Sequence, residues 1–97
     1  MKKLLLVLLF VPLVSFGQSA EEFFNRGSSK YSLEDYYGAI ADYTKAIELD
    51  PDDVTAYKNR SVAKEILGDL NGACADARKA ASLGHSNSAE WVKNQCN

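Results

Sequence analysis

The stretch "GAIADYTKAIELD", residues 38–50, returns one unit later in the chain as "GACADARKAASLG", residues 72–84. Sliding the chain against itself aligns residues 20–53 with residues 54–87, and about a third of the aligned pairs are identical. We call this offset, from residue 20 to residue 54, the repeat period. A fixed period of this length is typical of stacked supersecondary units, which bury their apolar faces against one another. The sequence therefore predicts a small repeat array.

Apolar residues within each unit follow helical spacing. They recur at i, i+3, i+4, i+7, i+10 and i+11, which places them on one face of a helix. These stripes are Tyr36, Ala39, Ile40, Tyr43, Ala46 and Ile47, then Leu70, Ala73, Cys74, Ala77, Ala80 and Ala81. An earlier helix in each unit is marked by Phe23, Gly27 and Leu33, then by Tyr57, Ser61 and Leu67. With polar or glycine-containing breaks between them, these segments predict an all-α fold.

The first unit carries a recognisable family pattern. "FFNRGSSKYSLEDYYGAIADYTKAIELDP", residues 23–51, resembles a tetratricopeptide repeat: an aromatic residue, a glycine four positions later, then "DYYGAI", "Y", "KAI" and a closing proline. The second unit is more degenerate, because Ser61 replaces the glycine, Ala77 replaces the second-helix tyrosine and His85 stands where Pro51 stood.

The end of the chain resembles the start of a third unit. Trp91 falls where the repeat period would place the next aromatic residue, and "KAASLGHSNSAEW", residues 79–91, is similar to a Sel1-like repeat. The resemblance implies an α-solenoid fragment of two helical hairpins, residues 20–53 and 54–87, closed by a capping helix at residues 87–96.

The amino-terminal stretch "MKKLLLVLLFVPLVSFG" has the order of a secretory signal peptide. Two lysines precede an apolar run, Leu4 to Val14, which is shorter than the roughly 20 residues that a membrane-spanning helix needs. We expect residues 1–17 to be removed by cleavage after Gly17, leaving a single domain, residues 18–97, that is periplasmic or secreted and has no membrane span. The alternative is an uncleaved membrane anchor.

Two cysteines in an exported chain indicate one disulfide. The predicted helices at 70–83 and 87–96 run antiparallel around a turn centred on residue 85, which sets Cys74 and Cys96 at the same height. We predict that they tie the last repeat to its cap. The alternative, a reactive redox pair, lacks the C-x-x-C spacing and an activating neighbour.

Sites for chemistry are not expected. The one histidine, His85, lies in a turn, and "DPDD", residues 50–53, lacks the ligand spacing of a calcium loop. Asp52 or Asp53 instead is expected to cap the helix that begins near Val54. Acidic residues outnumber basic ones in the full sequence, 13 to 11, and removal of the two lysines at positions 2 and 3 widens this excess, which argues against nucleic acid. We predict no enzymatic activity, no metal and no cofactor.

The family resemblance implies a concave groove lined by the first helix of each unit, which binds an extended peptide or a partner protein. The corresponding positions are Glu21, Phe24, Ser28 and Tyr31, then Thr55, Lys58, Val62 and Glu65. Phe24 and Tyr31 are expected to be exposed anchors, with charged positions setting polarity. The alternative is that the cap, a neighbouring helix or the amino end of the chain covers them.

The predicted function is a non-catalytic adaptor in an exported compartment. Two repeats offer little area, so we expect modest affinity or a weak homo-oligomer that enlarges the surface. The alternative is a structural subunit that associates with itself or stacks within a larger assembly.

Overall fold

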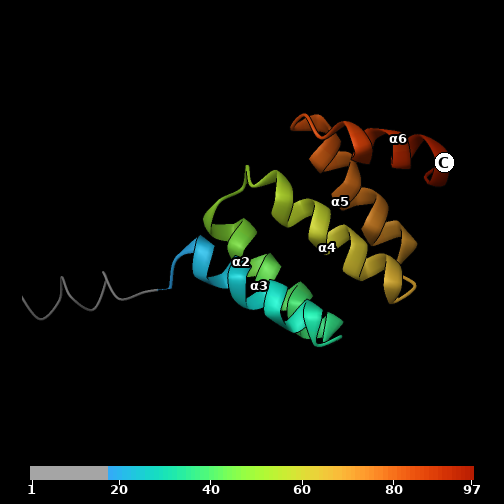
Figure 1. Ribbon diagram of the computed structural model, residues 1–97. Helices are drawn as coiled ribbons and strands as arrows, with labels where there is room; N and C mark the ends of the chain where they lie inside the picture. The colour runs from blue at the N-terminus through green and yellow to red at the C-terminus, as the bar shows by residue number, and fades with distance from the viewer. Residues whose placement is uncertain (1–17) are drawn as a thin grey trace, which may run out of the picture.

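The computed structural model describes residues 18–97, which form five α-helices and no strand (Figure 1). The helices are α2 (Ala20–Ser32), α3 (Tyr36–Leu49), α4 (Val54–Ile66), α5 (Leu70–Ser82) and α6 (Ser86–Gln95). The predicted all-α fold is confirmed, and the predicted cap at 87–96 corresponds to α6, with one residue of difference at each end. The predicted signal peptide lies outside the described residues.

Each helix packs against the next helix in the chain. α2 and α3 form one hairpin, α4 and α5 form a second, α4 joins the hairpins by packing on α3, and α6 packs on α5 (Figure 1). This arrangement is that of a helical-hairpin solenoid fragment. None of the helices in residues 18–97 is long and apolar enough to cross a membrane.

A side chain caps the first turn of every described helix. Ser19 and Glu22 form a reciprocal capping box at α2. Asp35 and Asp69 cap α3 and α5 by accepting hydrogen bonds from backbone N–H groups three residues later. Asp53 caps α4, accepting a 3.1 Å bond from the N–H of Ala56, so the predicted capping role of the 50–53 cluster is confirmed.

Three helices end in the same left-handed turn. The residue after the cap has positive φ in each case, at Glu34 (62°), Gly68 (86°) and Gly84 (107°). The next N–H reaches back five residues to a helix carbonyl, as from Asp35 to Lys30 at 2.8 Å, which is the Schellman pattern. Glycine accepts this conformation without strain, whereas Glu34 does not.

Small residues let the paired helices approach closely. The core is built mainly from alanines, with Tyr43 as the one large side chain among the described residues that is fully buried. At Gly27 an added Cβ would lie 3.0 Å from the Tyr43 ring. At the equivalent position in the second unit, the Ser61 hydroxyl donates a 2.8 Å bond to the carbonyl of Ala73.

Two predicted apolar positions are wrong. Leu33, a marker of the first helix, is 79% exposed because it lies beyond the last turn of α2, and Leu70, the first residue of the second stripe, is 48% exposed at the start of α5.

Each hairpin contains an ion-pair cluster that the apolar pattern does not predict. Asp42 is 4% exposed and accepts bidentate bonds from Arg26 at 2.9 and 3.0 Å, with Lys30 at 3.0 Å. Asp76, also 4% exposed, is held in the same way by Arg60 and Lys64. A buried carboxylate is retained only when it is paired, and here the pairing joins the two helices of a hairpin. The paired residues thus follow the repeat period.

The hydrogen bond from the Arg26 guanidinium is the main reason that the pKa of Asp42 is lowered, and the charges of Lys30 and Arg26 act in the same direction. Burial opposes this shift by penalising the carboxylate. Asp42 therefore holds its ionised form more strongly in the folded protein than in the unfolded chain.

The two clusters differ in how they are covered. Arg60 donates a further bond of 3.0 Å to the hydroxyl of Thr44 in the preceding hairpin, and its side chain is 15% exposed. Arg26, which has no preceding hairpin among the described residues, is 46% exposed. Within residues 18–97, the face of α2 that carries Arg26 is therefore exposed, whereas the equivalent face of α4 packs against α3.

α6 does not keep the repeat period. The capping residues of α2 and α4, Ser19 and Asp53, are separated by one full period, but the cap of α6, His85, comes two positions earlier than the next period would place it. As a result, Trp91 does not occupy the aromatic position of a third unit, which is filled by Ala89 instead. The placement of Trp91 from the period is wrong, because the connection into α6 is shorter.

Candidate functional site

The two cysteines fasten α6 at its carboxyl end. Cys74 of α5 and Cys96, the residue that follows α6, form a disulfide with their Cα atoms 5.9 Å apart. Both sulfurs are thus engaged, and neither acts as a free thiol in this structure. The bond joins the helices that the sequence analysis expected it to join.

A pocket of about 340 Å³ lies between α2 and α4, and we call it the α2–α4 pocket. Its lining comprises Ser28, Tyr31, Ser32, Tyr43, Lys58, Asn59 and Val62. Tyr43 stands at its base, where the phenol is 3.0 Å from the Ser28 hydroxyl and receives a 3.5 Å bond from the amide of Asn59. These bonds hold the lining residues of three helices in one arrangement.

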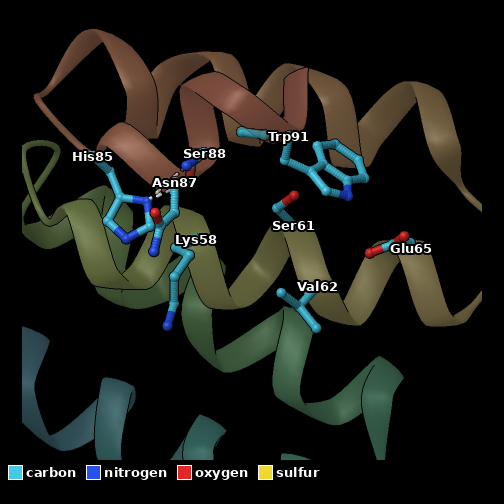
Figure 2. Close-up of a pocket in the computed structure, with 9 residues that line it drawn as sticks. Lys58, Ser61, Val62, Glu65, His85, Asn87, Ser88 and Trp91 are labelled. Carbon is cyan, nitrogen blue, oxygen red and sulfur yellow. Dashed lines mark hydrogen bonds between the residues drawn. The ribbon is translucent and has the colours of Figure 1, made fainter. Parts of the chain in front are cut away.

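A second pocket of about 240 Å³ lies between α4 and α6, and we call it the α4–α6 pocket. Its lining comprises Lys58, Ser61, Val62, Glu65, Ala77, His85, Asn87, Ser88 and Trp91. In Figure 2 the indole of Trp91 lies over Ser61, His85 and Asn87 lie at the Lys58 end, and Glu65 lies at the opposite end. Lys58 and Val62 line both pockets, so the two hollows are neighbours across α4.

Five of the eight predicted groove residues line these pockets. They are Ser28 and Tyr31 from α2, and Lys58, Val62 and Glu65 from α4. The other three, Glu21, Phe24 and Thr55, do not line either one. The structure thus brings the carboxyl-terminal half of α2 together with α4.

The expected exposure of the two aromatic anchors is corrected. Phe24 and Tyr31 are half-buried, because each packs against a tyrosine of α3. The ring centroids of Phe24 and Tyr43 are 5.5 Å apart, and those of Tyr31 and Tyr36 are 5.3 Å apart. Tyr31 still reaches the α2–α4 pocket, whereas Phe24 supports Tyr43 beneath it.

Sequence reasoning missed the contribution of α6. The predicted groove positions Glu21 and Thr55 each lie two residues after the cap of their helix. Asn87 lies two residues after the cap of α6, so counting groove positions from the cap would have predicted it as well. Trp91 is not found in this way, because it lies six residues after the cap His85. Its role depends on the shorter connection into α6.

The charges along α4 are arranged asymmetrically. Lys58 is half-buried and makes no ion pair within residues 18–97, whereas the other half-buried lysines, Lys30 and Lys64, are paired with aspartates. Glu65 lies about 10 Å further along the helix, two turns from Lys58. The α4–α6 pocket therefore has a basic end and an acidic end.

His85 caps the first turn of α6. Its Nδ1 accepts a 3.1 Å bond from the backbone N–H of Ser88 and lies 2.7 Å from the Ser88 hydroxyl. This nitrogen therefore acts as the acceptor that caps the helix. Residues 18–97 also contain no cluster of three or more metal-ligating side chains.

Large apolar side chains are exposed near the turns within the hairpins. Leu33 and Tyr37 are 79% and 76% exposed at the turn between α2 and α3. Ile66 and Leu70 are about half exposed at the turn between α4 and α5. Successive helices run in opposite directions, so the turn inside the first hairpin and the turn inside the second lie at the same edge of the array (Figure 1).

Comparison with known proteins identifies the repeat. A family model described as tetratricopeptide repeat matches residues 20–53, the hairpin of α2 and α3. The protein STIP1 homolog of Dictyostelium discoideum is 43% identical over 47 residues, which are 48% of this chain and 8% of that relative. The chain therefore matches less than a tenth of the length of this curated relative. Together with the hairpin fold, these similarities support a protein–protein interaction module.

Proposed function

We propose that this chain is a non-catalytic adaptor that binds an extended segment of a partner protein along the α2–α4 and α4–α6 pockets. The observation that carries the proposal is that Lys58 and Val62 line both pockets. One extended segment crossing α4 would contact both residues and enter both hollows. Val62 offers apolar contact, while Lys58 offers a positive charge that no side chain of the described residues neutralises.

The charge asymmetry gives the ligand a preferred direction. A carboxylate of the bound segment would pair with Lys58, and a basic group or free amino end would lie toward Glu65. The small lining area predicts modest affinity, which fits a transient adaptor.

We further propose that the adaptor is exported and that α4 and α5 form a second, degenerate tetratricopeptide repeat with α6 as a Sel1-like cap. The equivalent ion pairs of Asp42 and Asp76 support the second repeat. The disulfide supports an oxidising compartment, either the periplasm or the exterior, since such bonds are rare in reducing ones.

The test is selection of peptides from a displayed random library on the purified mature protein. Selected peptides would then be titrated against wild type, Lys58→Glu and Arg78→Glu. Arg78 is the matched control, because it is exposed on α5 and lines neither pocket. We expect an apolar residue beside an acidic one in the selected peptides, and at least a tenfold loss of affinity, about 1.4 kcal/mol, for Lys58→Glu alone. An equal loss in both variants, or no enrichment of any peptide, would contradict the proposal.

A self-associating structural subunit is the second candidate, favoured by the exposed apolar side chains at the turns, Leu33 and Tyr37 above all. Sedimentation of wild type and Leu33→Glu across a hundredfold range of concentration separates the two. A mass that rises with concentration in wild type and stays monomeric in the variant favours the subunit. A monomer throughout favours the adaptor.

A further inference from the structure

α6 buries few of its own side chains. It is a short helix, and Ser88 is its one buried residue, with Trp91 and Val92 half-buried. Isolated helices of this length are not stable in water, so α6 depends on its attachment to α5. The adjoining wall of the α4–α6 pocket depends on α6 in turn, because Asn87, Ser88 and Trp91 belong to it.

Trp91 lies between the two points at which α6 is fastened. At one end His85 caps the helix through the N–H of Ser88. At the other end Cys96 is bonded to Cys74 of α5. Fixing both ends determines where the indole lies, and with it the shape of the hollow over Ser61 and Val62.

The α2–α4 pocket has no such dependence. Its lining comes from α2, α3 and α4 alone, and the bonds of Tyr43 to Ser28 and Asn59 hold it together. Of the two pockets described above, the α4–α6 pocket needs α6 and the α2–α4 pocket does not.

We propose that the Cys74–Cys96 disulfide controls the groove by creating or abolishing the α4–α6 pocket. This inference rests on the proposed function and names its regulation and ligand class. In the disulfide form α6 is docked, and the pocket receives an apolar or aromatic side chain between Trp91 and Val62, with a neighbouring carboxylate at Lys58. In the dithiol form α6 separates from α5, and the α2–α4 pocket remains.

The chemical step is thiol–disulfide exchange with a dithiol reductant. A thiolate attacks one sulfur, the Cys74–Cys96 bond breaks, and two electrons and two protons pass to the cysteines while the reductant becomes a disulfide. Oxidation by a disulfide-bearing partner reverses the step with the same balance.

The experiment compares hydrogen exchange of the mature protein with and without dithiothreitol, beside Cys74→Ala/Cys96→Ser as a control that reductant cannot alter. We expect reduction to speed exchange in α6 at least tenfold while α2 to α4 change little. Trp91, the one tryptophan of the chain, gives a second readout through acrylamide quenching, which is expected to rise on reduction. The double variant is expected to behave like the reduced wild type in both conditions.

A peptide from the library selection, carrying an apolar residue beside an acidic one, is then titrated against both redox forms. We expect about tenfold weaker binding by the dithiol form. Unchanged exchange in α6, or equal peptide affinity in the two forms, overturns this inference but leaves the adaptor standing on the α2–α4 pocket. Failure of the selection to enrich any peptide overturns the adaptor itself, while the exchange data still decide whether the disulfide governs α6.

Discussion

Glu34 and Gly68 occupy equivalent turns, one repeat period apart, and both have positive φ, at 62° and 86°. A left-handed conformation costs a non-glycine residue about 1–2 kcal/mol, part of which glycine loses again through its greater freedom in the unfolded chain. We therefore expect Glu34→Gly to raise the free energy of unfolding by about 0.5 kcal/mol. The exposed side chain of Glu34 makes no hydrogen bond or ion pair within residues 18–97 that would offset this gain.

The matched change is Gly68→Ala, which is expected to lower the free energy of unfolding by about 1 kcal/mol although no atom would touch the new Cβ. Urea unfolding measures both variants. A destabilised Glu34→Gly, or an unaffected Gly68→Ala, would show that the turn conformation does not set these energies.

Asp42 makes stability depend on pH. Because its pKa is lowered in the folded state, the unfolded chain binds more protons as the solution is acidified. Its contribution is complete above the ordinary aspartate pKa of about 4 and is lost as pH falls through the lower folded pKa. We expect Asp42→Asn to be less stable than wild type at pH 7, with the difference in melting temperature shrinking toward pH 2.

Asp52→Asn is the control, since Asp52 is exposed and makes no ion pair among the described residues. Its difference from wild type is expected to be small at every pH. A gap for Asp42→Asn that stays constant with pH would mean that the carboxylate adds nothing through its charge.

The buried aspartates mark the limit of prediction at the residue scale. A pattern that counts apolar residues finds the stripe around Tyr43 and Ala77, but it treats Asp42 and Asp76 as solvent-facing. Their partners Arg26 and Arg60 are an identical pair in the alignment of the two units, so the repeat itself carries the signal, and only the geometry shows which residues meet.

At the scale of the element, α6 is the shortest of the described helices, with 10 residues. The disulfide closes a sequence separation of 22, and restricting the unfolded chain in this way contributes about 3 kcal/mol on the entropy model. We expect Cys96→Ser to lower the free energy of unfolding by about that amount without reductant. Cys96 is the better position to change than Cys74, because Cys74 is buried and its loss would also disturb packing.

In the presence of dithiothreitol, Cys96→Ser and wild type are expected to unfold at the same urea concentration. A difference that persists after reduction would assign the effect to the side chain rather than to the bond.

The location of α6 is predictable from the sequence to within a residue at each end, but its register is not. α5 and the turn that follows it are each one residue shorter than α3 and its turn, so the cap of α6 comes two positions early. This shift puts Trp91 six residues after the cap, where it lines the α4–α6 pocket, and leaves Ala89 at the aromatic position. A period measured on two units gives no means of predicting a change in the third.

At the scale of the whole molecule, we expect export to remove residues 1–17. Intact mass spectrometry of the protein recovered from outside the cytoplasm is then expected to show a chain that starts at Gln18 and is two hydrogens lighter than its dithiol form, because of the Cys74–Cys96 bond. A mass that retains residues 1–17 would favour the membrane anchor instead.

The general fold is predictable at this scale because the period and the helical spacing agree with each other. The groove is only partly predictable. The rule carried over from the family selects positions on α2 and α4, but it does not show that α3 covers Phe24 or that α6 completes the far pocket.

Within residues 18–97, the exposed face of α2 that carries Arg26 is a surface on which a further hairpin could pack. A variant carrying a second copy of residues 20–53 ahead of Ala20 would offer Arg26 the same threonine hydroxyl that Arg60 already uses. The opposite end is closed by a short polar helix under a covalent bond. An engineered array could therefore be lengthened by one hairpin at a time on the α2 side, while α6 keeps the other end fixed.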